Sequence, residues 1–205
     1  MVQGTGQAAS RRDHGKERTR AAILAAARDG FTEHGVDATT MNDIAAAAKV
    51  SRATLFNYFG GKTDILDALA EETRHAFAAR VERCCAASDD PAARILAAFA
   101  GSGERLERER RFWGPVIGHS ELGWNDASIV PRLDELVVHY ERLLGSDLPG
   151  AAHGADERRL LAEMAVGAYL NLVQRWRFDD GFPLQDRLIA AAAFIGRLLR
   201  DRGLA

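Results

Sequence analysis

The sequence predicts an all-α protein, and three observations lead to that fold class. No segment of useful length alternates apolar and polar residues with the period of two that half-buried strands show. Apolar side chains recur instead three and four positions apart, as they do on the buried face of a helix. Helix start and stop signals, among them Ser51, Pro91 and Gly60, separate these stretches. We therefore expect about nine helices.

The first third of the chain predicts three helices and the start of a long fourth one. Ile23, Ala27 and Phe31 lie four positions apart, and Gly35 supplies a stop signal behind them. Thr40 and Ser51 are N-cap candidates, because their hydroxyl oxygens can accept from the first backbone N–H groups of a helix. The expected helices cover 19–34, 41–48, 52–58 and 62–81.

The rest of the chain predicts further helices separated by loops. Pro91 suits the first turn of a fifth helix. Glycine and proline interrupt 112–125, so short helices or loops are expected there, and the composition of 146–155 indicates a loop. An apolar stripe at helical spacing follows Pro131. Two strongly periodic helices end the chain, at about 156–178 and 184–201.

Composition and cysteine usage exclude several classes of protein. Of the 205 residues, 47% are hydrophobic and 27% are charged, as in soluble globular proteins rather than disordered ones. No apolar stretch is long enough to span a membrane, and no apolar block follows the N-terminal arginines, so we expect a cytoplasmic protein without a signal peptide.

Cys84 and Cys85 are adjacent and lack metal-ligand spacing, so no metal and no cofactor are expected. A redox switch at this pair stands as an alternative to a plain core role.

The stretch from Thr39 to Lys62, TTMNDIAAAAKVSRATLFNYFGGK, predicts a helix-turn-helix. Two short helices joined by three residues cross at a large angle, and the run from Ala45 to Ala48 supplies small side chains for their contact. In this motif the N-terminal end of the second helix enters the major groove, and an arginine there suits a guanine edge. The residues at that end are Ser51, Arg52, Ala53 and Thr54, and Asn57 and Tyr58 are expected nearer the phosphates.

The alternative is a helical hairpin inside a larger core. A seven-residue helix with so little apolar surface stabilises a core poorly, which favours a DNA-reading role. Residues 1–62 carry a net charge of +3 and the remainder carries −5, as a polyanion-binding head on an acidic body would. A solvated face with a few extra arginines gives the same charge pattern, so the asymmetry alone does not decide.

The run from Val50 to Lys62 resembles the signature of TetR-family transcriptional regulators, and residues 19–66 match that family almost throughout. The resemblance implies a DNA-binding head of three helices on a helical body that dimerises and holds a small-molecule inducer. We accordingly expect a flexible basic arm at 1–16, the helix-turn-helix domain at 17–62 and a ligand-binding and dimerisation domain at 63–205. The arm is expected either to follow the DNA or to remain a solvated leader.

The resemblance also assigns roles to individual residues of the head. It places Thr40 and Asn42 at phosphates or bases, and Arg52, Ala53 and Thr54 at bases. Phe56 and Tyr58 occupy the aromatic positions beside the DNA backbone, and Lys62 matches a phosphate-contacting lysine. A lysine in the first turn of a helix opposes the helix dipole, which supports an anion as its partner. Three positions depart from the family pattern: Lys49 stands for a glycine, Phe56 for a tyrosine and Gly61 for a polar N-cap.

The body offers candidates for a largely apolar inducer site. The aromatic and polar candidates are Phe77, Arg80, Phe112, Trp113, His119, Trp124, Tyr140, Tyr169 and Trp176. A core role is the simpler explanation for most of the aromatic residues. By the same resemblance the last two helices form the homodimer interface, and a two-fold dimer would bind a palindromic operator in double-stranded DNA.

Together these observations predict a sequence-specific transcriptional regulator, a repressor released by its inducer. The alternative is a helical module that binds small molecules or proteins without specific DNA binding. An enzyme is not expected. The run from Gly118 to Gly123 approaches a nucleophile elbow but has Leu122 where a glycine is required, and no phosphate loop, dinucleotide fingerprint or zinc-protease motif occurs.

Overall fold

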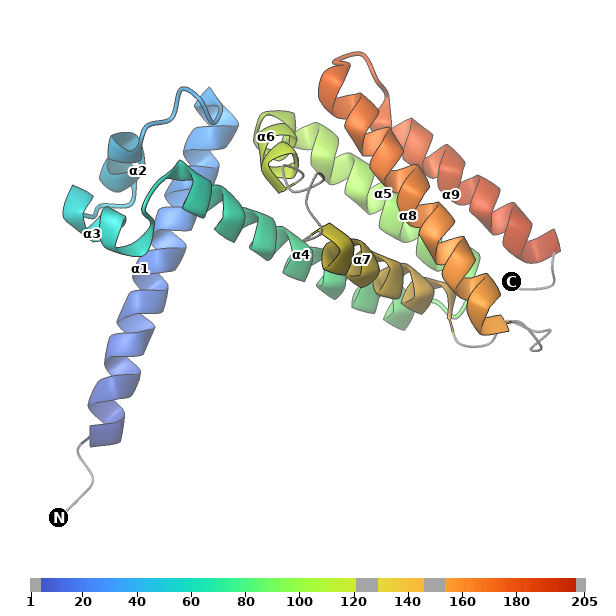
Figure 1. The fold of residues 1–205 in the computed structure, drawn as a ribbon, viewed down its shortest axis with the longest axis horizontal. Coiled ribbons are helices and arrows are strands. Elements are labelled where there is room, and N and C mark those ends of the chain that lie inside the picture. Colours follow the sequence, from blue (N-terminus) through green and yellow to red (C-terminus); the bar gives the residue numbers. More distant parts are fainter. Residues whose placement is uncertain (1–4, 121–128, 146–153, 202–205) are drawn as a thin grey trace. The chain divides into compact units, whose positions relative to one another are not determined.

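The computed structural model describes residues 5–120, 129–145 and 154–201, and within these ranges the chain forms nine helices (Figure 1). The helices are α1 (Thr5–His34), α2 (Met41–Ala47), α3 (Arg52–Tyr58), α4 (Lys62–Ala87), α5 (Pro91–Arg108), α6 (Arg110–Ser120), α7 (Ile129–Leu144), α8 (Gly154–Phe178) and α9 (Leu184–Asp201). The predicted all-α fold is confirmed. Among the described residues no helix is both long enough and apolar enough to cross a membrane.

The chain divides into two compact units. The first comprises residues 1–72 and 109–120, which include α1, α2, α3, the start of α4, and α6. The second comprises 73–108 and 121–205, which include the remainder of α4 together with α5, α7, α8 and α9. Helix α4 therefore belongs to both units, and α6 belongs to the first unit although its sequence neighbours belong to the second.

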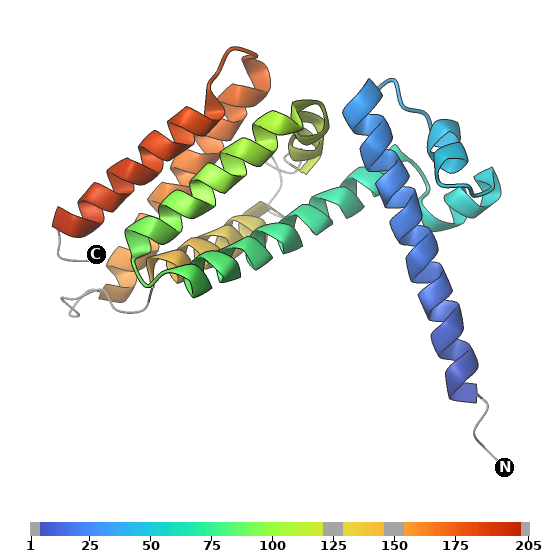
Figure 2. The same cartoon turned by 180° about the vertical axis from the view of Figure 1, so that it is seen from behind.

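The first unit is built around the C-terminal half of α1. Figures 1 and 2 show α2 and α3 beside this half, while the N-terminal half of α1 extends past them. The predicted face of Ile23, Ala27 and Phe31 is fully buried, and Ile44 of α2 and Leu55 of α3 are buried as well. Burial of these side chains orients two helices that are too short to be stable alone.

The second unit is a bundle in which α5 packs on α9 and α7 packs on α8 (Figure 2). Small residues allow the α5–α9 approach. A Cβ added at Gly103 would lie 2.8 Å from the Cα of Gln185, and one added at Gly196 would lie 3.1 Å from the Cβ of Ala92. The side chain of Glu107 accepts from the backbone N–H of Gln185 at 3.0 Å, which satisfies one orphan donor at the start of α9.

One helix differs from the sequence prediction. Helix α1 begins at Thr5 rather than near Thr19, so its first turns lie within the segment expected as a basic arm. Helix α6, of 11 residues, agrees with the short helices or loops expected at 112–125, and it continues through Pro115. Proline removes one backbone hydrogen bond from α6, but the complete burial of Phe112 and Trp113 and the near-complete burial of Val116 stabilise the helix.

Candidate DNA-binding surface and ligand site

Helix α2 begins with a capping box formed by Thr40 and Asp43. The Thr40 hydroxyl accepts from the Asp43 backbone N–H at 3.2 Å, and the Asp43 carboxylate accepts from the Thr40 N–H at 2.9 Å and from its hydroxyl at 2.6 Å. These hydrogen bonds hold the pKa of Asp43 below its ordinary value. The predicted cap at Thr40 is confirmed, and its hydroxyl is used in capping. Asn42 lies beside it, exposed, in the first turn.

The turn between α2 and α3 forces Lys49 into a left-handed backbone conformation, with φ of 57°. The Lys49 N–H donates to the carbonyl of Ala46 and the Val50 N–H donates to that of Ala45, at 3.1 and 3.0 Å. This pair of bonds is the Schellman arrangement, which favours glycine at the left-handed position. The strain predicted where Lys49 replaces the family's glycine is therefore confirmed.

Only part of the predicted alanine contact is formed between the two short helices. Ala45 is buried, whereas Ala46 and Ala47 are exposed, so the prediction that all four alanines fill the crossing is wrong for these two. The reason is the helical period, because consecutive residues point in different directions and only one side of α2 faces its neighbours.

Helix α3 presents a polar outer face. Ser51 caps it by accepting from the Thr54 N–H at 3.0 Å, and the two hydroxyls lie 2.8 Å apart. The side chains of Arg52, Ala53 and Asn57 are exposed.

An aromatic residue on the same face supports the arginine. The Cζ atom of Arg52 lies 5.4 Å from the centroid of the Phe56 ring, which is itself 40% exposed. Stacking on Phe56 limits the rotamers of the long Arg52 side chain. Arg52 stands at the N-terminal end of α3, which is expected to enter the major groove of DNA. Tyr58 is half-buried at the end of the helix.

The start of α4 differs from the family expectation in two ways. Gly61 offers no side-chain cap, but Asp64 in the first turn accepts from the Gly60 N–H at 2.7 Å and so ties the preceding chain to the start of α4. The Lys62 ammonium group donates to the carbonyls of Val36 at 2.8 Å and Asp37 at 3.3 Å. Two backbone carbonyls, rather than a phosphate, are the partners of this lysine in the free protein, and its contact with DNA remains a prediction.

Three ligand-site candidates lie in the first unit, on α6. The Phe112 and Trp113 rings are in edge contact at 4.6 Å between centroids, and the guanidinium of Arg28 lies 4.6 Å from the Phe112 centroid. Arg28 also pairs with Glu72 at 3.4 Å. His119 lies 3.0 Å from the Asp67 carboxylate on α4. Here the aromatic pair forms part of the core that holds α6 against α1.

Four other candidates come together in the second unit. Arg80 on α4 donates to the Ser102 hydroxyl of α5 at 2.9 Å. Phe77 lies beside Tyr140 of α7, with centroids 6.0 Å apart, and Tyr140 lies 6.5 Å from Tyr169 of α8. Trp176 is buried on α8, and Trp124 lies outside the described residues. Cys84, also on α4, is buried, and burial raises the pKa of its thiol, as expected for a core residue.

Comparison with known proteins decides the family. Residues 23–69 match the family described as bacterial regulatory proteins, tetR family. The chain is 32% identical over 134 residues to the HTH-type transcriptional repressor Rv3405c of Mycobacterium tuberculosis, an alignment that covers 65% of this chain and 67% of the relative. The chain belongs to the TetR family. It is also 30% identical over 134 residues to the transcriptional regulator BetI of Burkholderia mallei, with the same coverage.

Solved TetR-type structures agree with the fold of this TetR-family chain. Thermus thermophilus FadR in complex with lauroyl-CoA has a TM-score of 0.62 at 21% identity, covering 91% of this chain and 95% of FadR. The complex of SmeT, a Stenotrophomonas maltophilia repressor, with triclosan has a TM-score of 0.62 at 22% identity, covering 88% and 90%. At these identities the likeness concerns the fold. The chain is thus a helix-turn-helix transcriptional regulator, and its relatives are regulators rather than enzymes.

Sequence reasoning missed several residues that shape these sites. Asp64 stands three positions after the weak cap at Gly61, and this spacing is the signal that could have identified it. Ser102 and His139 complete the cluster of the second unit, but no motif marks them. Their proximity follows from the packing of α5 and α7 and is visible only in the fold.

Proposed function

We propose that this TetR-family regulator is a cytoplasmic homodimeric repressor that binds a palindromic operator and is released by a small molecule held in its second unit. The observation that carries the proposal is the outer face of α3, where Arg52 stacks on Phe56 beside the exposed Ala53 and Asn57. Arginine donates two hydrogen bonds to a guanine edge, and one such pair discriminates bases by about 1–3 kcal/mol. In this proposal the protein acts by binding DNA and a small molecule, and it turns over no substrate.

Contacts to the DNA backbone are assigned around this face. We propose that Thr40 and Asn42 at the start of α2, Tyr58 at the end of α3 and Lys62 at the start of α4 approach phosphates. The exposed side chain of Asn42 in the first turn of α2 supports the placement there.

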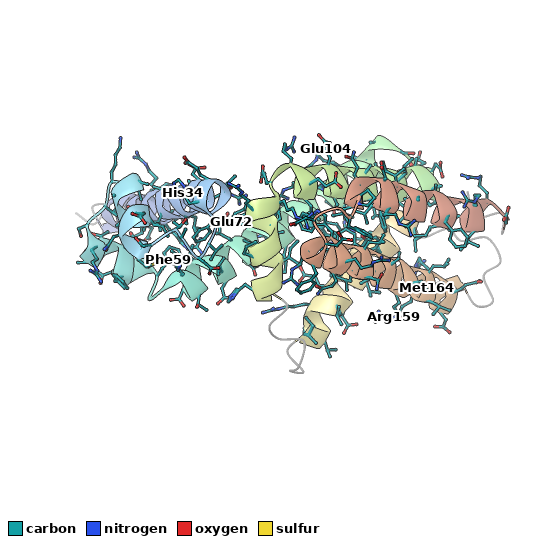
Figure 3. All side chains as sticks on the ribbon, turned by 90° about the horizontal axis from the view of Figure 1, so that it is seen from above. His34, Phe59, Glu72, Glu104, Arg159 and Met164 are labelled. Carbon is teal, nitrogen blue, oxygen red and sulfur yellow. The ribbon has the colours of Figure 1, made fainter. Side chains whose placement is uncertain are left out.

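The dimer is proposed to form through one outer surface of α8 and α9, which we call the α8/α9 face. It consists of Leu160, Met164, Phe178 and Phe194, which are 53–82% exposed. Met164 is labelled on α8 in Figure 3. Large apolar side chains that remain this exposed on neighbouring helices are typical of a surface covered by a partner. A two-fold axis there would present two α3 helices to half-sites about one DNA turn apart, or a small multiple of it.

The release mechanism is proposed to use α4, because this helix starts at Lys62 in the first unit and carries Arg80 in the second. A ligand in the second unit that prefers a different setting of α4 would change the spacing of the two DNA-binding units. A ligand favours release of the operator only to the extent that it binds more tightly to the conformation of the protein that does not bind DNA.

Light scattering of the complex with a selected palindromic duplex tests the proposal. The expected stoichiometry is two protomers per duplex, or two pairs for an extended site. A single protomer bound at saturation would contradict the dimeric mode of binding.

A further inference from the structure

The second unit contains a polar centre formed by four helices. Arg80 comes from α4, Ser102 from α5, Tyr140 from α7 and Tyr169 from α8. The guanidinium donates to the buried Ser102 hydroxyl at 2.9 Å. Arg80 lies against Gly101, where an added Cβ would be 3.8 Å from its Nη1 atom.

The charge of Arg80 is not balanced within the described part of this unit. Other arginines there pair with carboxylates, for example Arg94 with Asp89 at 3.4 Å and Arg159 with Asp134 at 2.8 Å. Arg80, which is half-buried, has no carboxylate within ion-pair distance among the described residues. A cation that is partly removed from water without a counter-charge is costly, so its placement calls for an explanation.

The neighbouring tyrosines do not supply the missing negative charge. Burial raises the pKa of Tyr140 well above its ordinary value and raises that of Tyr169, although Arg80 favours their charged forms. Both hydroxyls therefore stay protonated at neutral pH. They are neutral hydrogen-bonding groups beside a cation.

Aromatic rings surround this centre. Phe99 is in edge contact with both tyrosines, at centroid distances of 5.7 Å to Tyr140 and 5.8 Å to Tyr169. Phe77 contacts Tyr140 at 6.0 Å and the His139 ring at 5.7 Å. Phe99 and Tyr140 are buried, whereas Phe77, His139 and Tyr169 keep partial exposure, as does Arg80. The cluster thus joins buried rings with partly exposed ones.

His139 adds a second polar group, and one of its two ring nitrogens has no hydrogen-bond partner among the described residues. This nitrogen is Nδ1, which is buried. Burial lowers the pKa of His139 despite the nearby Glu135, so the ring is neutral at pH 7 and can donate or accept one hydrogen bond at this atom. Buried polar atoms without partners are rare in native proteins, and a ligand atom would satisfy this one.

We propose that this cluster is the effector site and that it selects a small aromatic carboxylate. The assignment rests on the proposed function of the second unit and names the chemistry of its ligand. The planar guanidinium of Arg80 binds the carboxylate, for which its fork of N–H donors is well suited, and Ser102 keeps that fork in position. Phe77, Phe99 and Tyr140 contact the ring of the ligand. A cationic ligand is repelled by Arg80, and a neutral ligand leaves the positive charge of Arg80 without a counter-charge.

The test compares three probes with the same ring: naphthoate, naphthamide and naphthylmethylammonium. Calorimetry measures their binding to the full-length protein, to Arg80→Gln and to Arg83→Gln, which removes an exposed arginine from the same helix. We expect naphthoate to bind at least about tenfold more tightly than naphthamide, because hydrogen bonds to charged groups are the stronger ones. The ammonium probe should bind least. Arg80→Gln should lose the preference for naphthoate and keep its naphthamide affinity, while Arg83→Gln behaves as the unaltered protein.

Three results would overturn the inference: equal binding of naphthoate and naphthamide, no binding of any probe, or an unchanged preference in Arg80→Gln. The probe series on the unaltered protein decides the matter if Arg80→Gln does not give a folded circular dichroism spectrum. DNA binding without probe is measured on the same samples. Intact operator binding without a naphthoate preference contradicts the ligand class alone, and a naphthoate preference without operator binding contradicts the proposed repressor alone.

Discussion

Phe56 supports Arg52 on the outer face of α3, with the Cζ atom of the guanidinium 5.4 Å from the centroid of the ring. The two residues are four positions apart and so occupy the same face of the helix. Phenylalanine cannot donate to a phosphate as the tyrosine common in the family can. In this chain its ring has a different use, because it restricts the arginine that is proposed to contact bases.

Phe56→Ala should therefore weaken specific DNA binding. Loss of an exposed cation–π contact is expected to cost roughly 0.5–1 kcal/mol, or about a two- to fivefold increase in Kd. Fluorescence anisotropy with the selected duplex measures the change, and Phe56→Tyr serves as the control that keeps the stacking. Equal affinities for Phe56→Ala and the unaltered protein would show that the ring does not support Arg52.

Lys49→Gly should stabilise the protein, because glycine adopts the left-handed conformation at φ of 57° without a Cβ clash. The relief of about 1–2 kcal/mol is partly offset by the greater freedom of glycine in the unfolded chain, which leaves a gain of roughly 0.5–1 kcal/mol. Urea unfolding measures it. Lys49→Ala removes the same charge but keeps the Cβ, and a gain as large in that variant would mean that backbone strain is not the cause.

The stability lost on removal of Asp43 should depend on pH in a defined direction. Hydrogen bonds from Thr40 hold the pKa of Asp43 below its ordinary value, so its contribution is present above that value and is lost as pH falls through the lower, folded-state pKa. Asp43→Ala should therefore be less stable than the unaltered protein at pH 7, with the difference shrinking below about pH 4. Thermal unfolding across this range measures it. The control Asp29→Ala removes an exposed carboxylate of α1, and a difference for Asp43→Ala that stays constant with pH would contradict the capping role.

Charge introduced on the α8/α9 face should dissociate the dimer. Met164→Glu and Phe194→Glu each place a carboxylate in a surface proposed to be buried between protomers, where an unpaired charge is costly. Size-exclusion chromatography with light scattering should give the mass of one protomer for both variants. Val138→Glu alters a similarly exposed apolar residue on α7 and should remain dimeric. A monomeric unaltered protein, or dimeric variants, would remove the support for this interface.

Local signals carried most of the fold prediction. Thr40, Ser51 and Pro91 mark helix starts whose backbone requirements are satisfied within a few residues, so the sequence is sufficient to find them. The strain at Lys49 was also local. Helix α6 was not predictable in this way, because its continuation through Pro115 depends on burial of Phe112 and Trp113 in the first unit.

In the candidate sites, too, features set by residues close in sequence could be predicted, and features set by packing between distant segments could not. The polar face of α3 could be predicted, since one short helix carries it. The partners of Lys62 could not, because Val36 and Asp37 belong to the loop after α1, far away in sequence. The aromatic candidates of the body were predicted as one set, but Phe77, Tyr140 and Tyr169 come together in the second unit while Phe112 and Trp113 pack around Arg28 in the first. Residue type alone cannot make that distinction.

We propose that α3 reads a palindrome through Arg52. The proposal is tested by selection from a random duplex pool with the purified protein, repeated with Arg52→Ala, Thr54→Ala and the control Arg83→Ala. We expect the unaltered protein and Arg83→Ala to enrich a palindromic sequence, and the two α3 variants to lose or relax that sequence. Absence of any enriched sequence at low salt, or the same palindrome selected by Arg52→Ala, would contradict it.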